Sequence, residues 1–247
     1  MSDALTMAGR SLRISARTPD ALITALAMPV MLMLVFVYFF GGAIDTGGEY
    51  VQYVVPGVLV LCAGFGAGNT AMSVTHDMHG GIIDRFRAMD VGGAAILAGH
   101  VTASLARNLA ATAVVFGVAT AIGFRAQASA AGWLAAIGVL VCYIVALSWL
   151  AATVGLIAKS PEAAGGFTFF IGFLPYPSSG FVPVGTMPSW LRGFAEHQPL
   201  TPVIESMRGL LLGQSVGGSA WQALAWCAGI TVVSVAAADV LYRRRTG

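Results

Sequence analysis

The chain has 247 residues, of which 57% are hydrophobic and only 10% are charged, and its formal net charge at pH 7 is +2. Soluble domains carry about 25% charged residues, so this chain has too few charges to cover a water-exposed surface, and most of its surface is expected to face lipid. The small net charge and the lack of a basic stretch interleaved with aromatic residues exclude a typical nucleic-acid-binding protein.

The N-terminal segment Ala4–Arg17 is predicted to form an amphipathic helix at the membrane interface. Arg10, Arg13 and Arg17 recur at spacings of three and four residues, which places them on one helical face. Arginines on such a face contact lipid phosphates. The alternative is a basic tail that only sets topology. A removable signal peptide is not expected, because these arginines are not followed by a short apolar core with a cleavage site.

Six apolar segments are long enough to cross a membrane. A helix rises about 1.5 Å per residue, so about 20 residues span a hydrocarbon core roughly 30 Å thick. The third segment contains Arg107 and Asn108, and the fifth is interrupted near its end by Pro175 and Pro177. Residues 1–247 are therefore predicted to form one all-α membrane domain. The six segments are Leu22–Phe40, Tyr53–Val74, Val101–Phe124, Trp133–Ile157, Ala163–Val182 and Trp221–Leu241.

The distribution of positive charge predicts that both termini lie in the cytoplasm. Cytoplasmic loops of membrane proteins carry an excess of lysine and arginine. With this orientation nine such residues lie inside and three outside, whereas the opposite orientation reverses the ratio. The inner residues are Arg10, Arg13, Arg17, Arg85, Arg87, Lys159, Arg243, Arg244 and Arg245, and the outer ones are Arg125, Arg192 and Arg208.

The segment His76–Asp90 (HDMHGGIIDRFRAMD), after the second span, concentrates charge in a charge-poor chain. Its apolar residues share one helical face and most of its charges lie elsewhere, which predicts a short helix parallel to the membrane that suits docking of a soluble partner. An ordinary solvated, positive-inside loop is the alternative, and the residues alone favour neither. The apolar residues are Ile82, Ile83, Phe86 and Met89, and the charged ones include Asp84, Arg85 and Arg87.

No metal site or disulfide framework is predicted. His76 and His79 lack further ligands at helical spacing, and a metal needs about four. Cys62, Cys142 and Cys227 lie in three separate apolar runs without CxxC spacing, as small hydrophobic residues would.

Few polar residues lie within the predicted spans. No series of acidic residues is present there, which argues against an ion-coupled transporter or proton relay. Arg107 lies close enough to the cytoplasmic end to reach the headgroups. Asn69 and Thr70, with Phe65 nearby, are candidates for a substrate path, and helix–helix contacts are the alternative for the two polar residues.

The stretch Pro175–Gly213 has too many prolines for one crossing helix and too few charges for a free loop. Irregular backbone at membrane depth needs cover from protein or a water-filled cavity. We therefore expect a re-entrant hairpin or short helices that form an outer cap, with aromatic residues at the interface. Its polar members line an exit gate or pair with one another. They are Glu196, His197, Glu205 and Arg208.

The chain is not expected to hydrolyse ATP. A P-loop requires the pattern GxxxxGK[ST], because its backbone amides and lysine hold the phosphates. The only lysine is Lys159, and Thr153 and Ala158 occupy the glycine positions before it.

Four stretches of the chain carry a family resemblance. Gly80–Met89 (GGIIDRFRAM) resembles the G-x-x-D-R-x-R-x-x-P stretch of the permease subunits of type-2 ABC exporters, in the daunorubicin-exporter-like branch. Phe181–Gly213 is similar to the region between the fifth and sixth spans of that branch, and Tyr53–Gly57 (YVVPG) to the opening of its second span. Leu97–Arg125 also matches, so the resemblance covers nearly the whole chain. One departure is Asp90, where the branch usually has proline.

The resemblance implies a permease with six helices per subunit in the cytoplasmic membrane. It further implies a second permease subunit, identical or a sister chain, and an ABC ATP-binding subunit that holds ATP and Mg²⁺, with no cofactor in this chain. It places the coupling to the ATPase in the segment after the second span and the exit gate in the cap. The coupling residues would be Asp77, Gly80, Asp84, Arg85, Phe86 and Arg87, and the gate residues Phe181, Pro183, Glu196, Glu205 and Arg208.

Two other functions compete with that of an exporter. An intramembrane protease would use Ser178 or Ser179 with His197 as a dyad, and it would need that base within hydrogen-bond reach and an oxyanion hole. A serine beside two prolines near the outer surface is a weak candidate for such a nucleophile. A channel or scaffold subunit without ATP coupling is the other rival. The apolar path with few fixed charges fits hydrophobic or amphipathic cargo such as drugs, natural products or lipids, and does not choose among them.

Overall fold

The computed structural model describes the backbone of residues 19–80 and 93–246, and every regular element in these ranges is a helix. The segment predicted as an interfacial helix, 4–17, lies outside them. The elements are α2 (Pro19–Val35), the π-helical turn η1 (Phe36–Phe40), α3 (Tyr50–His79), α5 (Gly93–Ala121), α6 (Ala130–Ile157), α7 (Pro161–Phe173), the 3₁₀ turn η2 (Val184–Thr186), α8 (Ser189–His197), α9 (Leu200–Leu211) and α10 (Ser219–Thr246).

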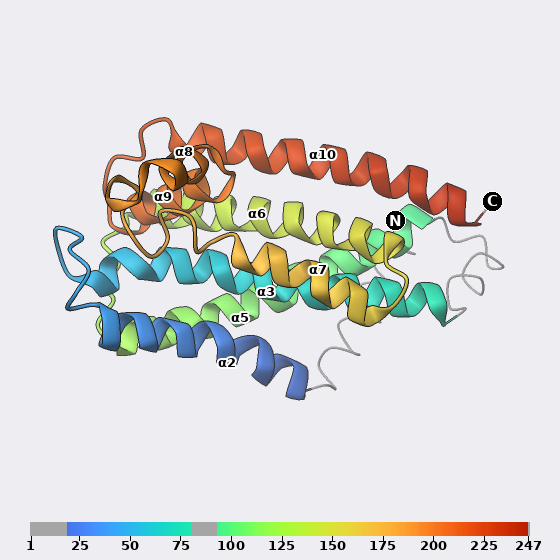
Figure 1. Cartoon of the computed structure of the whole chain (residues 1–247), viewed down its shortest axis with the longest axis horizontal. Coiled ribbons are helices and arrows are strands. Elements are labelled where there is room, and N and C mark those ends of the chain that lie inside the picture. Colours follow the sequence, from blue (N-terminus) through green and yellow to red (C-terminus); the bar gives the residue numbers. More distant parts are fainter. Residues whose placement is uncertain (1–18, 81–92, 247) are drawn as a thin grey trace.

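The long helices run lengthwise beside one another and alternate in direction (Figure 1). Helix α3 lies at the centre and packs against α2, α5, α6, α7 and α9, while α10 packs mainly on α6 and α9. Loops 41–49 and 122–129 lie at the end of the bundle that also holds α8 and α9, on the left of Figure 1. We call this the cap end, and we call residues 174–213 the cap.

Within residues 19–80 and 93–246, four helices are long and apolar enough to cross a membrane: Tyr50–His79, Ala95–Ala121, Ala130–Ile157 and Ser219–Arg244, with a shorter apolar helix at Leu26–Phe40. Only 17% of the most apolar stretch of the last of these is buried within the chain, so its outer face needs an apolar surrounding. Exposed side chains on that face include Trp226, Val232 and Val233. The all-helical membrane fold is thus confirmed, and six crossings with cytoplasmic termini stay a prediction.

The fifth predicted span, Ala163–Val182, differs from the structure. Helix α7 begins at Pro161, where the Ser160 side chain accepts a hydrogen bond from the Ala163 amide (3.2 Å), and it ends at Phe173. Its 13 residues correspond to about 20 Å of helix, too short for the hydrocarbon core. Residues 174–182 form turns instead, because Pro175 and Pro177 lack the amide protons that a continuing helix needs.

The predicted loop His76–Asp90 also begins later than expected. His76–His79 form the last turn of α3, and the His79 ring hydrogen-bonds the Thr75 carbonyl at 2.8 Å. Gly80 ends the helix by donating its amide proton to the His76 carbonyl (2.9 Å). Residues 81–92 lie outside the described ranges.

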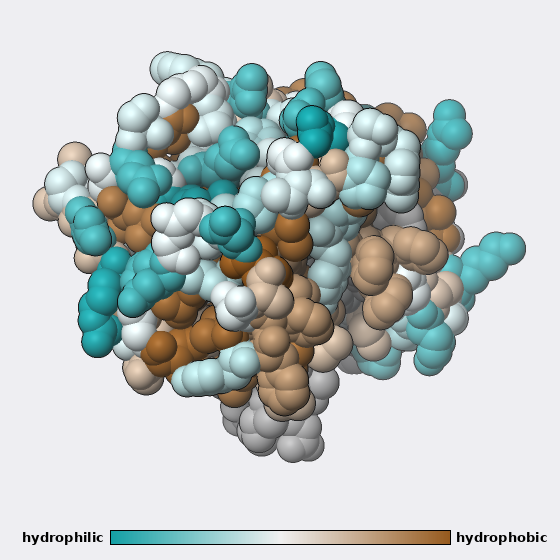
Figure 2. All heavy atoms as spheres, turned by 60° about the vertical axis from the view of Figure 1, so that its left-hand side comes forward, coloured by the Kyte–Doolittle hydropathy of each residue, from teal (hydrophilic) through white to brown (hydrophobic). Residues whose placement is uncertain are grey.

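The cap consists of turns and short helices, one of the two forms expected for Pro175–Gly213. Helix α9 is buried along most of its length against α3, α6 and α10, whereas α8 is mostly exposed. Hydrophilic side chains gather over the cap end, with hydrophobic ones visible between and beside them (Figure 2). The cap therefore closes one end of the bundle, and its place outside the membrane stays a prediction.

Candidate functional site

Arg208 of α9 ties the cap to the start of α3. Its Nε donates to the Tyr53 carbonyl (3.1 Å) and its Nη2 to the Ser179 carbonyl (2.6 Å). The guanidinium also lies 3.8 Å from the centroid of the Tyr53 ring, a distance at which a cation interacts with the ring face. The Tyr53 hydroxyl donates to the same Ser179 carbonyl (2.8 Å). One arginine thus joins α9, α3 and the turn after α7.

The environment of Arg208 is partly desolvated. Burial lowers the pKa of its guanidinium from the usual value, and the neighbouring Tyr53 and Glu205 act in the opposite direction. An arginine stays protonated at neutral pH despite such a shift, so the contact to Tyr53 keeps its cationic partner.

Phe181 is the second buried anchor of the cap. Its carbonyl accepts a hydrogen bond from the Tyr50 hydroxyl (2.8 Å), and its ring lies 4.5 Å from Phe36 and 5.1 Å from Tyr176, centroid to centroid. The first turn of α3 therefore binds the cap backbone through two tyrosines, Tyr50 and Tyr53. Sequence analysis did not single out Tyr50, although its position three residues before Tyr53 places both on one helical face.

Gly57 allows α3 to lie directly against the cap backbone. A Cβ at this position would lie 2.6 Å from the carbonyl oxygen and 2.7 Å from the Cα of Gly180. Contacts this short do not occur between real side chains and backbone, so the glycine of the YVVPG motif is required for close packing.

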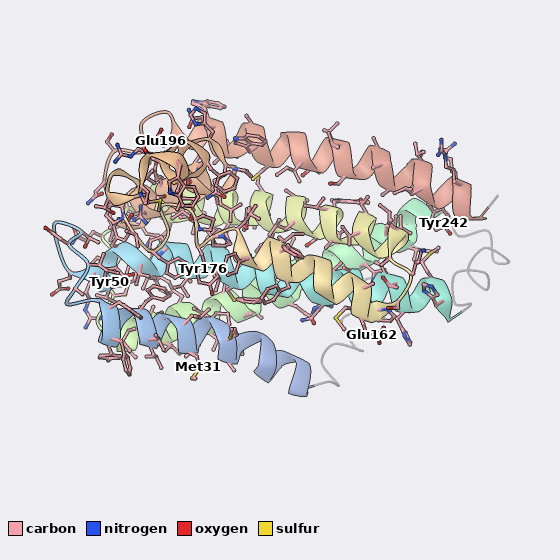
Figure 3. All side chains as sticks on the ribbon, in the orientation of Figure 1. Met31, Tyr50, Glu162, Tyr176, Glu196 and Tyr242 are labelled. Carbon is pink, nitrogen blue, oxygen red and sulfur yellow. The ribbon has the colours of Figure 1, made fainter. Side chains whose placement is uncertain are left out.

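The remaining predicted gate residues do not join this contact. Glu196 is exposed on α8, at the cap end of the bundle (Figure 3). Pro183 is half-buried just before η2, and Glu205 is exposed on α9. None of these three described side chains forms a hydrogen bond or ion pair with Arg208, although Glu205 lies close enough to act on its pKa. The structure brings Phe181 and Arg208 to the start of α3 and leaves Glu196 and Pro183 apart.

The predicted substrate-path residues lie in the helix bundle. Thr70 is buried and accepts a hydrogen bond from Arg107 Nη2 (3.3 Å), which joins α3 to α5. Phe65 is half-buried beside Gly172 of α7, where a Cβ would lie 3.4 Å from its ring. Asn69 is also half-buried. The three residues thus have different neighbours. The hydrogen bond of Thr70 joins α3 to α5, as in the alternative of a helix–helix contact.

A line of polar side chains on α5 was largely missed. Ser104, Asn108 and Thr112 recur every four residues and are all buried. Ser104 Oγ accepts from Asn108 Nδ2 (3.2 Å) and from Ser148 Oγ of α6 (2.8 Å). Asn108 fills the space that Gly66 leaves on α3, because a Cβ on Gly66 would lie 1.6 Å from the Asn108 Oδ1. The four-residue spacing was the signal in the sequence.

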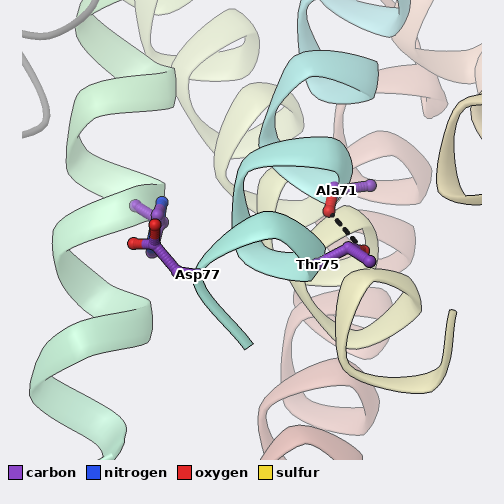
Figure 4. Close-up of polar contacts among 4 residues, drawn as sticks. Ala71, Thr75 and Asp77 are labelled. Carbon is purple, nitrogen blue, oxygen red and sulfur yellow. Dashed lines mark hydrogen bonds and ion pairs between the residues drawn. The ribbon is translucent and has the colours of Figure 1, made fainter. Parts of the chain in front are cut away.

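At the opposite end of the bundle, Asp77 points from α3 towards α5 (Figure 4). It is buried, and its Oδ2 lies 3.2 Å from Nε2 of His100 on α5. Of the other predicted coupling residues, Gly80 ends α3, while Asp84, Arg85, Phe86 and Arg87 lie outside the described ranges. The Asp77–His100 contact thus joins the two helices that flank residues 81–92, and His100 was not singled out from sequence.

On the other side of α3, Thr75 contacts α6. Its hydroxyl lies 2.9 Å from the Ala71 carbonyl, drawn in Figure 4, and 3.0 Å from the Gly155 carbonyl of α6. A Cβ on Gly155 would lie 2.6 Å from the Ala71 carbonyl oxygen. The end of α3 is therefore held closely on two sides, by α6 through Thr75 and by α5 through Asp77.

We expect His100→Ala to lower the stability of the folded chain by about 1–3 kcal/mol, because it leaves the buried Asp77 carboxylate without its ring partner. Thermal unfolding of the purified protein in detergent measures the change. His197→Ala is the matched control, since this ring is exposed and hydrogen-bonds only the Gly193 carbonyl of its own helix. Equal unfolding temperatures for the two variants would show that the Asp77–His100 pair contributes no stability.

Comparison with known proteins gives full-length relatives. A family model described as ABC-2 type transporter matches residues 3–212. The daunorubicin resistance ABC transporter permease protein DrrB1 of Streptomyces coeruleorubidus is 30% identical over 247 residues, which cover 99% of this chain and 87% of that protein. The probable doxorubicin resistance ABC transporter permease protein DrrC of Mycobacterium tuberculosis is 27% identical over 246 residues, with coverages of 99% and 89%.

Proposed function

The chain belongs to the ABC-2 type transporter family, and from this we propose that it is the membrane-spanning permease subunit of an ATP-driven exporter. The observation that carries the proposal is the end-to-end similarity to permeases, which covers 99% of the chain. The bundle of long apolar helices supports it, because a permease needs such helices to cross the bilayer.

We infer that ATP is hydrolysed on a separate subunit. The chain has no P-loop, since its only lysine lacks the preceding glycines. Residues 76–90, with their amphipathic pattern, would dock to the ATP-binding partner and form the coupling segment. Within it, Asp84, Arg85 and Arg87 carry the charges that a soluble partner would contact.

Helix α3 is suited to carry motion from that segment to the cap. It has 30 residues, about 45 Å of helix, and it leads directly into the coupling segment at its C-terminal end. At its other end Tyr50 and Tyr53 bind the cap carbonyls of Phe181 and Ser179. A shift of α3 driven by ATP binding to the partner would therefore move the cap as well, which is how a two-state gate is biased by a ligand.

The cargo is proposed to be hydrophobic or amphipathic and to move outward across the cytoplasmic membrane. The relatives are named for resistance to daunorubicin and doxorubicin. Consistent with such cargo, the described membrane helices carry few charges. A second permease subunit, identical or a sister chain, would complete the path.

The test is co-purification of the ATP-binding subunit. We expect the tagged wild-type chain, extracted in mild detergent from its native cell, to retain a P-loop ATPase at one-to-one stoichiometry by mass spectrometry. The double variant Arg85→Glu/Arg87→Glu should lose at least nine-tenths of this partner, because each reversed charge replaces attraction with repulsion at the docking surface.

The matched control is Arg243→Glu/Arg244→Glu, which reverses two exposed charges on α10 and should retain the partner. Equal recovery of both variants in the membrane fraction excludes misfolding. If the folded wild-type chain holds no ATPase, the exporter proposal fails and a channel or scaffold subunit becomes the better interpretation. If the 85/87 variant keeps the ATPase, the coupling lies elsewhere in the chain.

A further inference from the structure

An open pocket of about 620 Å³ lies at the cap end of the bundle. Four separate segments line it: the loop before α3, the start of α3, the α5–α6 loop, and the end of α9 with the residues after it. This end of the bundle faces the reader in Figure 2. The charged and amide-bearing lining residues are Glu49, Gln52, Arg125, Gln127, Arg208 and Gln214.

Backbone contacts hold two walls of the pocket together. The backbone amide of Gln127 donates to the Leu211 carbonyl (2.8 Å), which fixes the α5–α6 loop against α9. Gly213 follows with φ +65°, and a Cβ there would lie 2.8 Å from the Gln127 carbonyl oxygen. The positive φ and the short distance to Gln127 both require a glycine at this position. Gly213 therefore allows the residues after α9 to lie directly against the α5–α6 loop.

A third wall is held by Gln52. Its Nε2 donates to the Gly123 carbonyl (3.3 Å), and its Oε1 accepts from the Arg125 amide (3.2 Å). The loop that precedes α3 is ordered by Asp45, whose Oδ1 accepts from the Gly47 amide (3.0 Å). The pocket is therefore formed before any ligand enters, which lowers the cost of ordering on binding.

The hydrogen-bonding groups of the pocket favour an anion. Arg125 uses Nη1 on the Thr120 and Phe124 carbonyls, and Arg208 uses Nε and Nη2 on the carbonyls described above. Each guanidinium has five donor protons, so both keep donors for a ligand. The side-chain amides of Gln127 and Gln214 are exposed and add further donors to the lining. Glu49 supplies the one carboxylate, so the lining is net positive.

We propose that this pocket binds the oxyanion headgroup, a phosphate or a carboxylate, of an amphiphile. Guanidinium groups match the geometry of such oxyanions and bind them through paired hydrogen bonds. Tyr38, Phe39 and Phe40 of η1 precede the loop that forms one wall, and their side chains are exposed, so an apolar tail has a surface to lie on. The site extends the proposed function by naming a ligand at the exit side, and its binding does not require the ATPase.

The test measures lipid binding to the purified chain by native mass spectrometry, with phosphatidylglycerol as the anionic probe and phosphatidylcholine as the neutral one. We expect phosphatidylglycerol to bind more tightly. Arg125→Gln should weaken its binding about tenfold, since a charge-assisted hydrogen bond is lost. Glu49→Gln should strengthen it severalfold, because the only lining carboxylate is removed. Arg192→Gln, on α8 and not part of the pocket lining, is the matched control and should bind as the wild type does.

The opposite signs expected for Arg125→Gln and Glu49→Gln separate recognition from misfolding, because unfolding cannot strengthen binding. Inorganic phosphate, titrated by calorimetry, distinguishes the sources of the anion. If phosphate follows the same order of variants, the oxyanion itself is recognised and no tail is needed. If phosphatidylcholine binds as tightly as phosphatidylglycerol, or if neither Arg125→Gln nor Glu49→Gln changes binding, the proposal is overturned. Loss of the ATPase partner would leave these results unchanged.

Discussion

Gly57→Ala is expected to abolish the proposed export while the chain still reaches the membrane. The added Cβ would lie 2.6–2.9 Å from the carbonyl oxygen, Cα and carbonyl carbon of Gly180, all backbone atoms that no rotamer change can move away. Relief requires the cap to shift relative to α3, and overpacking of this kind costs about 1–3 kcal/mol. Because α3 also holds the cap through Tyr50 and Tyr53, the shift would break the contact by which the two are proposed to move together.

With the proposed ATPase partner co-expressed, efflux of a hydrophobic or amphipathic compound of the proposed cargo class gives the export readout, and thermal unfolding in detergent gives the stability readout. Gly138→Ala is the matched control, since it introduces the same methyl group into the membrane helix α6 where a Cβ meets no atom within 4 Å. Normal export by Gly57→Ala would show that the close approach of α3 to the cap is dispensable.

The membrane class and most helix positions could be predicted from composition and length alone. Three predicted spans lie within longer helices, and the third, Val101–Phe124, overlaps α5 up to its end at Ala121, because a run of about 20 apolar residues has few other folds in lipid. The ends of the helices were not predictable in the same way. The last turn of α3 continues through His76–His79, where local polarity suggested a loop, because buried contacts of Thr75 and Asp77 hold it in place.

The fifth span shows the limit of hydropathy. Ala163–Val182 is apolar throughout, but α7 ends at Phe173 because the prolines after it prevent a continuous helix. The following turns are satisfied by side chains from distant parts of the chain, such as Tyr50 and Arg208. The Tyr50 and Arg208 side chains lie 131 and 29 positions along the chain from the carbonyls that they contact, and no local pattern predicts these pairs.

The cap anchors illustrate the same point for the candidate site. Arg208 was predicted as a gate residue from its place in a charge-poor segment, yet its partners are two backbone carbonyls and a tyrosine ring. Backbone carbonyls look alike in every sequence, so neither acceptor was predictable. The pairing of Asp77 with His100 likewise depends on the packing of α3 on α5. Sequence thus pointed to Arg208 and Asp77 and the fold supplied their partners, while their roles in gating and coupling stay predictions.

Arg208→Lys is expected to destabilise the folded chain by about 2–4 kcal/mol although it keeps the charge. A lysine ammonium is a single point charge and cannot donate to the Tyr53 and Ser179 carbonyls in the planar geometry that Nε and Nη2 provide. Hydrogen bonds from charged groups contribute about 1.5–3 kcal/mol each. The lower end of the expected range applies if the lysine partly reforms one of the two bonds. Thermal unfolding in detergent, with export measured alongside, tests this expectation.

Arg192→Lys provides the control, because Arg192 also donates to backbone carbonyls of the cap but is exposed, so its replacement should change stability by less than about 0.5 kcal/mol. A double-mutant cycle with Tyr53→Phe then measures the interaction energy between the Tyr53 hydroxyl and Arg208. Tyr53 and Arg208 donate to the same Ser179 carbonyl and stack on one another, so their effects should be non-additive by more than about 0.5 kcal/mol. Additive effects would mean that the two side chains hold the cap independently, and Arg208 would no longer be the group through which α9 follows α3.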